Sequence, residues 1–160
     1  MMRRTCRALV AAVALVATTS CATAAERPGA SEPVWLMTEG EAALAPPPLT
    51  RAAAELPRSG PVIKIVTPQQ AAEVTAPFVV EIQFEQRVGG AAVKMDTLKL
   101  TVLKIFEIDI TDRVKPYVLE KETKLLVKEA KIPVGRHRLK LLIADAEGRL
   151  TGEILEVTVK

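Results

Sequence analysis

The feature that most limits the fold of this chain is an alternation of apolar and polar residues in short segments after Pro61. The segment 77–85 shows it best, because four of its apolar side chains fall on one face of an extended strand. These four are Phe78, Val80, Ile82 and Phe84. Turn residues interrupt the alternation about every ten positions, a spacing typical of all-β sandwiches and barrels. The pattern therefore predicts an all-β domain over residues 61–160.

The alternating segments predict strands at 62–67, 77–85, 97–104, 105–110, 125–129, 137–143 and 150–159. In the third of these, the apolar residues are expected to face inward, and Lys99, Thr101 and Lys104 mostly outward. About seven strands in about 100 residues are the usual content of an immunoglobulin-like antiparallel β-sandwich. A domain of this length can bury an adequate core without disulfides.

The first 24 residues have the three parts of a secretory signal. Arg3, Arg4 and Arg7 supply positive charge, Ala8–Ala17 is an unbroken apolar run, and Ala22–Ala24 has the small residues of a cleavage site. The apolar run is too short to cross a membrane, which takes about 20 residues. The sequence therefore predicts a signal peptide and a periplasmic or secreted product.

Cys21 allows a second interpretation of the signal. Residues 17–21 resemble a permissive bacterial lipobox, in which the cysteine is lipidated and becomes the new N-terminus, although Thr18 stands where leucine is usual. Two alternatives stay open: a lipoprotein attached to the membrane only through acyl chains on Cys21, or a free protein cleaved after Ala24.

Removal of the signal changes the charge and the cysteine count. Three of the 22 basic residues precede Ala24 and all 19 acidic residues follow it, so the mature chain carries 19 of each. Nucleic-acid binding has the electrostatic signature of a basic patch or stripe, and the mature composition gives no reason to expect one. Both cysteines lie within the signal region, so cleavage after Ala24 leaves no disulfide framework and no thiolate metal site.

Residues 25–60 are rich in proline and alanine, and they are predicted to form a flexible linker between the signal and the domain. One apolar island, Pro33–Met37, contains the single tryptophan, Trp35. We expect this island to be either a short docking motif or a tail that packs loosely on the domain or has no role.

Two motifs near the C-terminus carry a family resemblance. The first is the alternation of Pro133, Gly135, His137, Leu139 and Leu141, and the second is Asp145 followed by Gly148 and Arg149. With a final alternating strand, they resemble the last two strands of bacterial immunoglobulin-like and fibronectin-III-like envelope domains, whose first strand is similar to the segment Pro61–Pro68. The resemblance covers about residues 61–160 and implies a fold, because such domains serve many functions. His137 stands where that family commonly has tyrosine.

The domain offers few residues for catalysis. A nucleophilic mechanism needs a base beside a serine or cysteine, but the serines after the signal, Ser31 and Ser59, both lie in the predicted linker. His137, the only histidine, is expected to be structural, with a ring nitrogen bonded to a backbone carbonyl near the start of its strand. Gly135 and Gly148 are expected to be structural turn residues. The sequence thus predicts a protein without enzymatic activity and without a cofactor.

Charged residues suggest two further possibilities. Asp109 with Asp112, and Asp145 with Glu147, are close acidic pairs that could share a calcium ion if their loops lie at one end of the sandwich. Basic residues alternate along several strands, with acidic residues between them. They could form a face for an acidic glycan or lipid headgroup, but cross-strand ion pairs are the favoured interpretation. Only Tyr117 and Trp35 could stack on a sugar.

These observations favour a non-catalytic, exported immunoglobulin-like module that contacts an envelope protein, whose identity the sequence does not give. The alternative is a periplasmic carrier domain for a small ligand, a divalent ion or a glycan.

Overall fold

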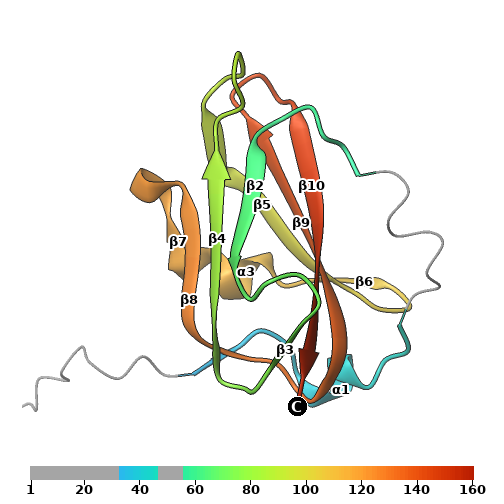
Figure 1. The fold of residues 1–160 in the computed structure, drawn as a ribbon. Coiled ribbons are helices and arrows are strands. Elements are labelled where there is room, and N and C mark those ends of the chain that lie inside the picture. The colour runs from blue at the N-terminus through green and yellow to red at the C-terminus, as the bar shows by residue number, and fades with distance from the viewer. Residues whose placement is uncertain (1–32, 47–55) are drawn as a thin grey trace, which may run out of the picture.

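The computed structural model describes residues 33–46 and 56–160, so the predicted signal peptide and Cys21 lie outside the described residues. The described chain forms two five-stranded sheets that face each other (Figure 1). Sheet A has the order β1 (Val34–Trp35), β8 (Lys124–Lys131), β4 (Phe78–Glu85) and β2 (Val62–Thr67), with β7 (Val118–Leu119) also paired to β8. Sheet B has the order β3 (Ala72–Val74), β10 (Leu150–Val159), β9 (Gly135–Asp145), β5 (Val93–Leu103) and β6 (Glu107–Asp109).

The prediction of an all-β, immunoglobulin-like sandwich is confirmed. The strand number is higher than the expected seven or so, because β1, β3 and β7 have only two or three residues each. Strands this short leave no readable alternation in the sequence. Ladders between long strands are antiparallel, and parallel pairing joins β1 to β8 and β3 to β10.

The alternation in the sequence becomes the inner face of each sheet. In β4, Val80, Ile82 and Phe84 are each at most 2% exposed, and in β9 the side chains of Leu141 and Ile143 are fully buried. The β9–β10 hairpin is in register from Gly135 opposite Val159 to Ala144 opposite Leu150. Because successive side chains point to opposite faces, this register keeps the whole apolar set of both strands on the core side.

Thr101 in β5 and Lys104, which directly follows β5, were expected to be exposed on the outer face, but both are buried. Thr101 is 2% exposed and Lys104 is 5% exposed. Thr101 pairs with Asp109 on one side and Lys140 on the other, and the ion pair between Lys140 and Glu107 joins β9 to β6 across β5. The Nζ of Lys104 donates a hydrogen bond to the Ala42 carbonyl at 2.8 Å.

Short helices connect the strands. Two lie between β6 and β7, namely α3 (Thr111–Val114) and the 3-10 helix η1 (Lys115–Tyr117). A second 3-10 helix, η2 (Glu120–Glu122), joins β7 to β8. The expected strand 105–110 is shorter in the structure, because Ile105 and Phe106 occupy the exposed tip of the β5–β6 hairpin. Among the described residues, no helix has the length and apolar character that a membrane crossing requires.

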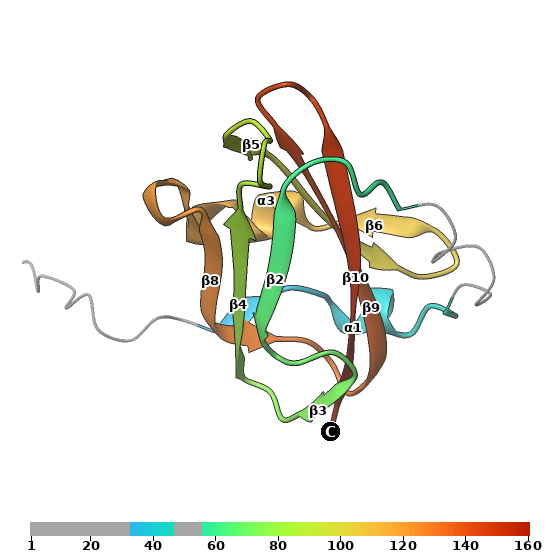
Figure 2. The ribbon, with the colours of Figure 1, turned by 45° about the horizontal axis from the view of Figure 1, so that its top comes forward.

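Residues 33–46, which the sequence assigned to a flexible linker, pack on the sandwich; we call this segment the strap. It contains β1 and α1 (Glu39–Ala42), and Figure 2 shows it running behind β4 and β2 from β8 towards β9. Leu36 and Met37 are 1% and 0% exposed and belong to the core. Further along, the described part of the linker also contacts β10, since the Gly152 amide donates to the Pro57 carbonyl at 2.7 Å.

Candidate functional site: a groove at the edge of β8

The outer edge of β8 has a gap in its strand pairing. One edge of β8 pairs with β4. On the opposite edge, β7 pairs at Lys124 and Leu125, and β1 pairs at Ala130 and Lys131. Within the described residues, no strand covers this edge over residues 126–129. At about 3.3 Å per residue, the stretch without strand pairing is about 13 Å long, and η1 contacts β8 beside it.

Prolines explain why the chain leaves this gap open. Pro33 directly precedes β1, and Pro116 stands two residues before β7 within η1. Proline has no backbone N–H and cannot donate to a strand ladder. Extension of either short strand along β8 would bring one of these prolines opposite the unpaired stretch. The local sequence thus ends both flanking strands before they meet.

A groove of about 410 Å³ lies along the gap. We call it the edge groove; it is lined by Val34, Pro116, Tyr117, Leu119, Leu126, Lys128 and Glu129. Its walls are mainly apolar, and Leu119 is 36% exposed. Lys128 and Glu129 contribute one charge of each sign, and neither forms an ion pair within the described residues. The groove can therefore accept an apolar, extended ligand with backbone hydrogen-bonding groups.

Trp35 lies on the other side of β1 beside a second hollow of about 460 Å³. Its side chain is 53% exposed, and the Lys131 ammonium is 5.4 Å from the ring centroid. This distance is within the range of a cation–π contact. The polar residues Glu39, Lys131 and Lys160 also line the hollow.

The strap builds one wall of each hollow, and two cations hold it in place. The Arg113 guanidinium donates to both carboxylate oxygens of Glu41, at 2.8 and 2.7 Å, and to the Leu36 carbonyl at 2.9 Å. Hydrogen bonding from Arg113 lowers the pKa of Glu41 to about 2. Lys104 supplies the bond to Ala42, and burial lowers the pKa of its ammonium. The geometry of both hollows therefore depends on these contacts.

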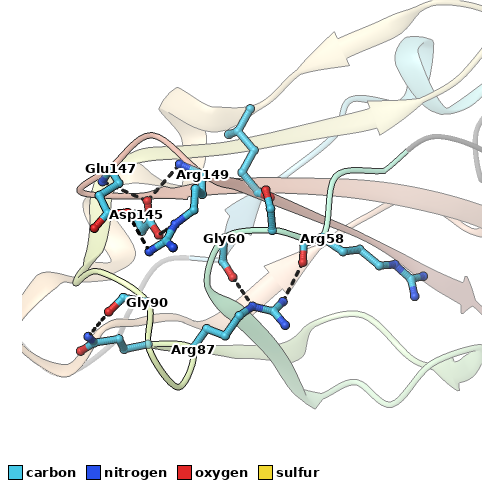
Figure 3. Close-up of polar contacts among 10 residues, drawn as sticks. Arg58, Gly60, Arg87, Gly90, Asp145, Glu147 and Arg149 are labelled. Carbon is cyan, nitrogen blue, oxygen red and sulfur yellow. Dashed lines mark hydrogen bonds and ion pairs between the residues drawn. The ribbon is translucent and has the colours of Figure 1, made fainter.

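Asp145 and Glu147, the second acidic pair, form hydrogen bonds and ion pairs within the β9–β10 turn. Figure 3 shows the Asp145 carboxylate facing Arg149. Its Oδ1 accepts hydrogen bonds from the amides of Glu147 and Arg149, and its Oδ2 accepts from the Arg149 guanidinium at 2.7 Å. Burial raises the pKa of Asp145, but these hydrogen bonds outweigh it and hold the pKa below its ordinary value. The guanidinium occupies the place of a cation, so this pair is a turn-stabilising cluster.

The other acidic pair is equally engaged. The Asp109 carboxylate accepts from the Thr111 amide at 2.9 Å and lies 3.5 Å from the Lys99 ammonium, and hydrogen bonding from Thr111 lowers its pKa. Asp112 pairs with Lys115. Asp109 lies beside Thr101 and Asp145 beside Val93, at opposite ends of β5. On β9, the residues opposite these two positions, Lys140 and Asp145, are five residues or about 17 Å apart. The two loops therefore do not lie at one end of the sandwich, the arrangement that a shared ion was expected to need. In the part of the chain that the structure describes, no three His, Cys, Asp or Glu side chains gather as metal ligands.

The structural residues near the C-terminus lie in turns and at the core edge. The His137 ring is 2% exposed, and its Nε2 is 2.8 Å from the Pro133 carbonyl, the type of contact expected for it. Burial lowers the pKa of His137, the Pro133 bond opposes this shift, and nearby Lys104 adds to it. Gly148 has φ of +79° in the β9–β10 turn and Gly135 has φ of +135°, conformations that favour glycine.

The outer face of sheet B confirms the predicted cross-strand ion pairs. Lys99 pairs with Asp109, and Lys140 with Glu107. Glu156 accepts from both Arg136 and Arg138, at 2.8 and 2.6 Å. The basic residues of β9 are thus matched by neighbouring carboxylates. This arrangement argues against a free cationic surface on this face.

Sequence reasoning missed the edge groove, although it noted Trp35 and Tyr117. Val34 and Leu126 gave no signal, because each is an ordinary apolar residue in the sequence. The available signal was the pair of prolines, Pro33 and Pro116, each placed just before a very short strand. Their significance appears only once both strands are known to pair with β8.

No protein-family model matches the chain, and no curated protein matches its sequence. Its structure is similar to CopC from Methylosinus trichosporium OB3b, with 18% identity, a TM-score of 0.42, and coverage of 64% of this chain and 94% of CopC. It is also similar to an endo-β-1,4-mannanase from Thermotoga petrophila, with 12% identity, a TM-score of 0.45, and coverage of 62% of this chain and 20% of the mannanase. Likeness at this level carries no conclusion about function.

Proposed function

We propose that this chain is a non-catalytic, exported immunoglobulin-like module of the bacterial cell envelope, which binds a segment of another envelope protein in the edge groove. The observation that carries the proposal is the unpaired stretch of β8 between β7 and β1, with an apolar groove along it. The signal-like N-terminus supports export, either as a periplasmic or secreted protein or as a lipoprotein anchored at Cys21.

Strand addition accounts for how such a site would work. An extended peptide that joins a sheet edge gains main-chain hydrogen bonds, and pockets for alternate side chains give specificity. Here Leu126 and Tyr117 offer apolar contacts beside the unpaired backbone of β8. No cofactor and no bond-breaking step are needed for this activity.

A library of linear peptides displayed on phage, selected against the exported chain, tests the proposal. The variant Leu126→Glu places a charge in the groove, and Val66→Glu is the matched control. Val66 is 42% exposed in β2, at the edge of sheet A away from β8. We expect Leu126→Glu to weaken the selected peptides at least about tenfold, or about 1.4 kcal/mol, and Val66→Glu to leave them unchanged. Failure to select any peptide, or equal loss in both variants, would overturn the proposal.

Glycan binding is a second candidate function, supported by the exposure of Trp35 beside the hollow that Glu39, Lys131 and Lys160 also line. An exposed aromatic ring can stack on the apolar face of a sugar while polar groups at the rim bind hydroxyls. Calorimetric titration with neutral and acidic oligosaccharides would show binding that Trp35→Ala abolishes and Leu126→Glu does not. Absence of heat with every oligosaccharide would remove this candidate.

A further inference from the structure

We infer that the edge groove takes a single extended peptide of about four or five residues, from a chain end or an interdomain linker of the partner. We infer further that it excludes the sheet edge of a folded domain and a second copy of this chain. The inference rests on the proposed function and specifies the partner of the same site. It comes from the shape of the gap, the irregularity of β8 and the residues that line the groove.

The gap is closed at both ends. β7 covers β8 at Lys124 and Leu125, and β1 covers it at Ala130 and Lys131, so the open edge is recessed between two strands of the same chain. A recess about 13 Å long holds about four residues of an extended strand. The edge strand of a folded domain brings its neighbouring strands and loops with it, and these would meet β7 and β1.

The same recess argues against a second copy. In antiparallel pairing of two β8 edges, β7 of one copy would lie towards β1 of the other at each end of the contact. A stable protein interface buries about 800 Å² on each partner. Four residues of strand cannot supply this area when the flanking strands hold the two molecules apart.

An irregularity in β8 also favours a short ligand. Phe78 pairs with Ala130 and Val80 pairs with Val127, so two β8 residues, Lys128 and Glu129, lie opposite Val79. An extra residue of this kind is a β-bulge, which bends and twists the strand that carries it. Bulges at sheet edges disfavour long, regular pairing with another sheet. A short flexible peptide can follow the bend.

The residues that line the groove define the side chains of the peptide. Tyr117, Leu119 and Leu126 form an apolar wall, and Lys128 and Glu129 together carry no net charge. An extended peptide directs every second side chain to the same face. The groove is therefore complementary to alternating apolar residues separated by small polar ones, with no strong requirement for ligand charge.

The test compares two probes that present the same residues. One is a capped linear pentapeptide of alternating threonine and valine, and the other is a backbone-cyclised β-hairpin with that sequence as its free edge. Fluorescence anisotropy measures binding to the exported chain and to its Leu126→Glu and Val66→Glu variants. We expect the linear peptide to bind at least about tenfold more tightly than the hairpin. Only Leu126→Glu should weaken it, and N-methylation of alternate amides should abolish its binding.

Three outcomes would overturn the inference. Equal binding of hairpin and linear peptide would show that the recess does not exclude a sheet edge. A dimer seen by light scattering and lost in Leu126→Glu would identify a second copy as the occupant. Failure of the pentapeptide to bind, when library-selected peptides bind in a Leu126-dependent way, would reject the stated side-chain class while leaving the proposed function intact. Failure of every linear peptide would reject both.

Discussion

The strap and the β9–β10 hairpin contribute to the same core by different physical means. The hairpin pairs continuously from Gly135 with Val159 to Ala144 with Leu150, and its two strands are joined by a turn at Asp145–Gly148. The strap pairs with β8 at only two residues, and it is held by cationic side chains that donate to its carbonyls and to Glu41. The comparison shows that a segment can enter a core through polar contacts distant in sequence as well as through a local ladder.

Matched truncations of core leucines test whether the strap is as integral as the hairpin. Leu141 in β9 and Leu36 in the strap are 0% and 1% exposed. Replacement of a buried leucine by alanine costs about 3 kcal/mol, since it removes packed atoms and leaves a cavity. We expect Leu141→Ala and Leu36→Ala to lower the free energy of unfolding in urea by similar amounts. A loss below about 0.5 kcal/mol for Leu36→Ala alone would show that the strap is a surface appendage and not part of the core.

Loss of the ion pair between Arg113 and Glu41 is expected to have the next largest effect on stability. Arg113→Met removes three hydrogen bonds to the strap and should cost about 1–2 kcal/mol at neutral pH. The pKa of Glu41 is lowered in the folded protein from 4.5 to about 2. Its stabilising contribution is therefore present above about pH 4.5 and is lost as the pH falls towards 2.

Urea denaturation at pH 7 and pH 3 measures this contribution. The difference between wild type and Arg113→Met should shrink at the lower pH, and the control Lys115→Met should show no such change, because the Lys115 side chain is 66% exposed. A difference of the same size at both pH values would mean that Arg113 stabilises the strap through packing and not through its ion pair with Glu41.

The sequence predicts the hairpin much better than it predicts the strap or the edge groove. The period-two pattern of β4 and β9, and the turn glycine Gly148, are local features, and they predict strands and a hairpin directly. The burial of Leu36 depends on Arg113, which lies 77 positions away. No pattern within residues 33–46 reports that contact, and their prolines suggest a linker instead. The edge groove is hidden for the same reason, since it needs β1, β7 and β8 to be placed together.

A smaller effect is expected from His137 at the start of the hairpin. Burial keeps its pKa below 6.5 in the folded protein, so the unfolded chain binds a proton first as the pH falls. The contribution of the neutral ring to the free energy of unfolding is therefore present above about pH 6.5 and is lost as the pH falls below it. His137 is the only histidine in the chain.

The free energy of unfolding of wild type should fall between pH 7.5 and about pH 5.5, the range in which an ordinary histidine titrates. The variant His137→Asn, although less stable overall, should show a flat profile over this range. A flat profile in wild type would mean that His137 binds a proton equally well in the folded and unfolded states. Burial beside Lys104 would then not lower its pKa in the folded protein.

The smallest effect concerns the ion pairs on the outer face of the hairpin. Glu156 accepts from Arg136, whose side chain is 66% exposed, and from Arg138, whose side chain is 14% exposed. An exposed ion pair contributes about 0.5 kcal/mol or less, and here Arg138 still satisfies the carboxylate when Arg136 is absent. Arg136→Gln should therefore change the urea midpoint little, and Arg138→Gln somewhat more. If Arg136→Gln cost as much as Arg113→Met, the hairpin would depend on its charges as the strap does. The small expected value instead assigns the stability of the hairpin to its register and its buried face, whereas the strap depends on its ion pair with Arg113 as well as on its buried Leu36.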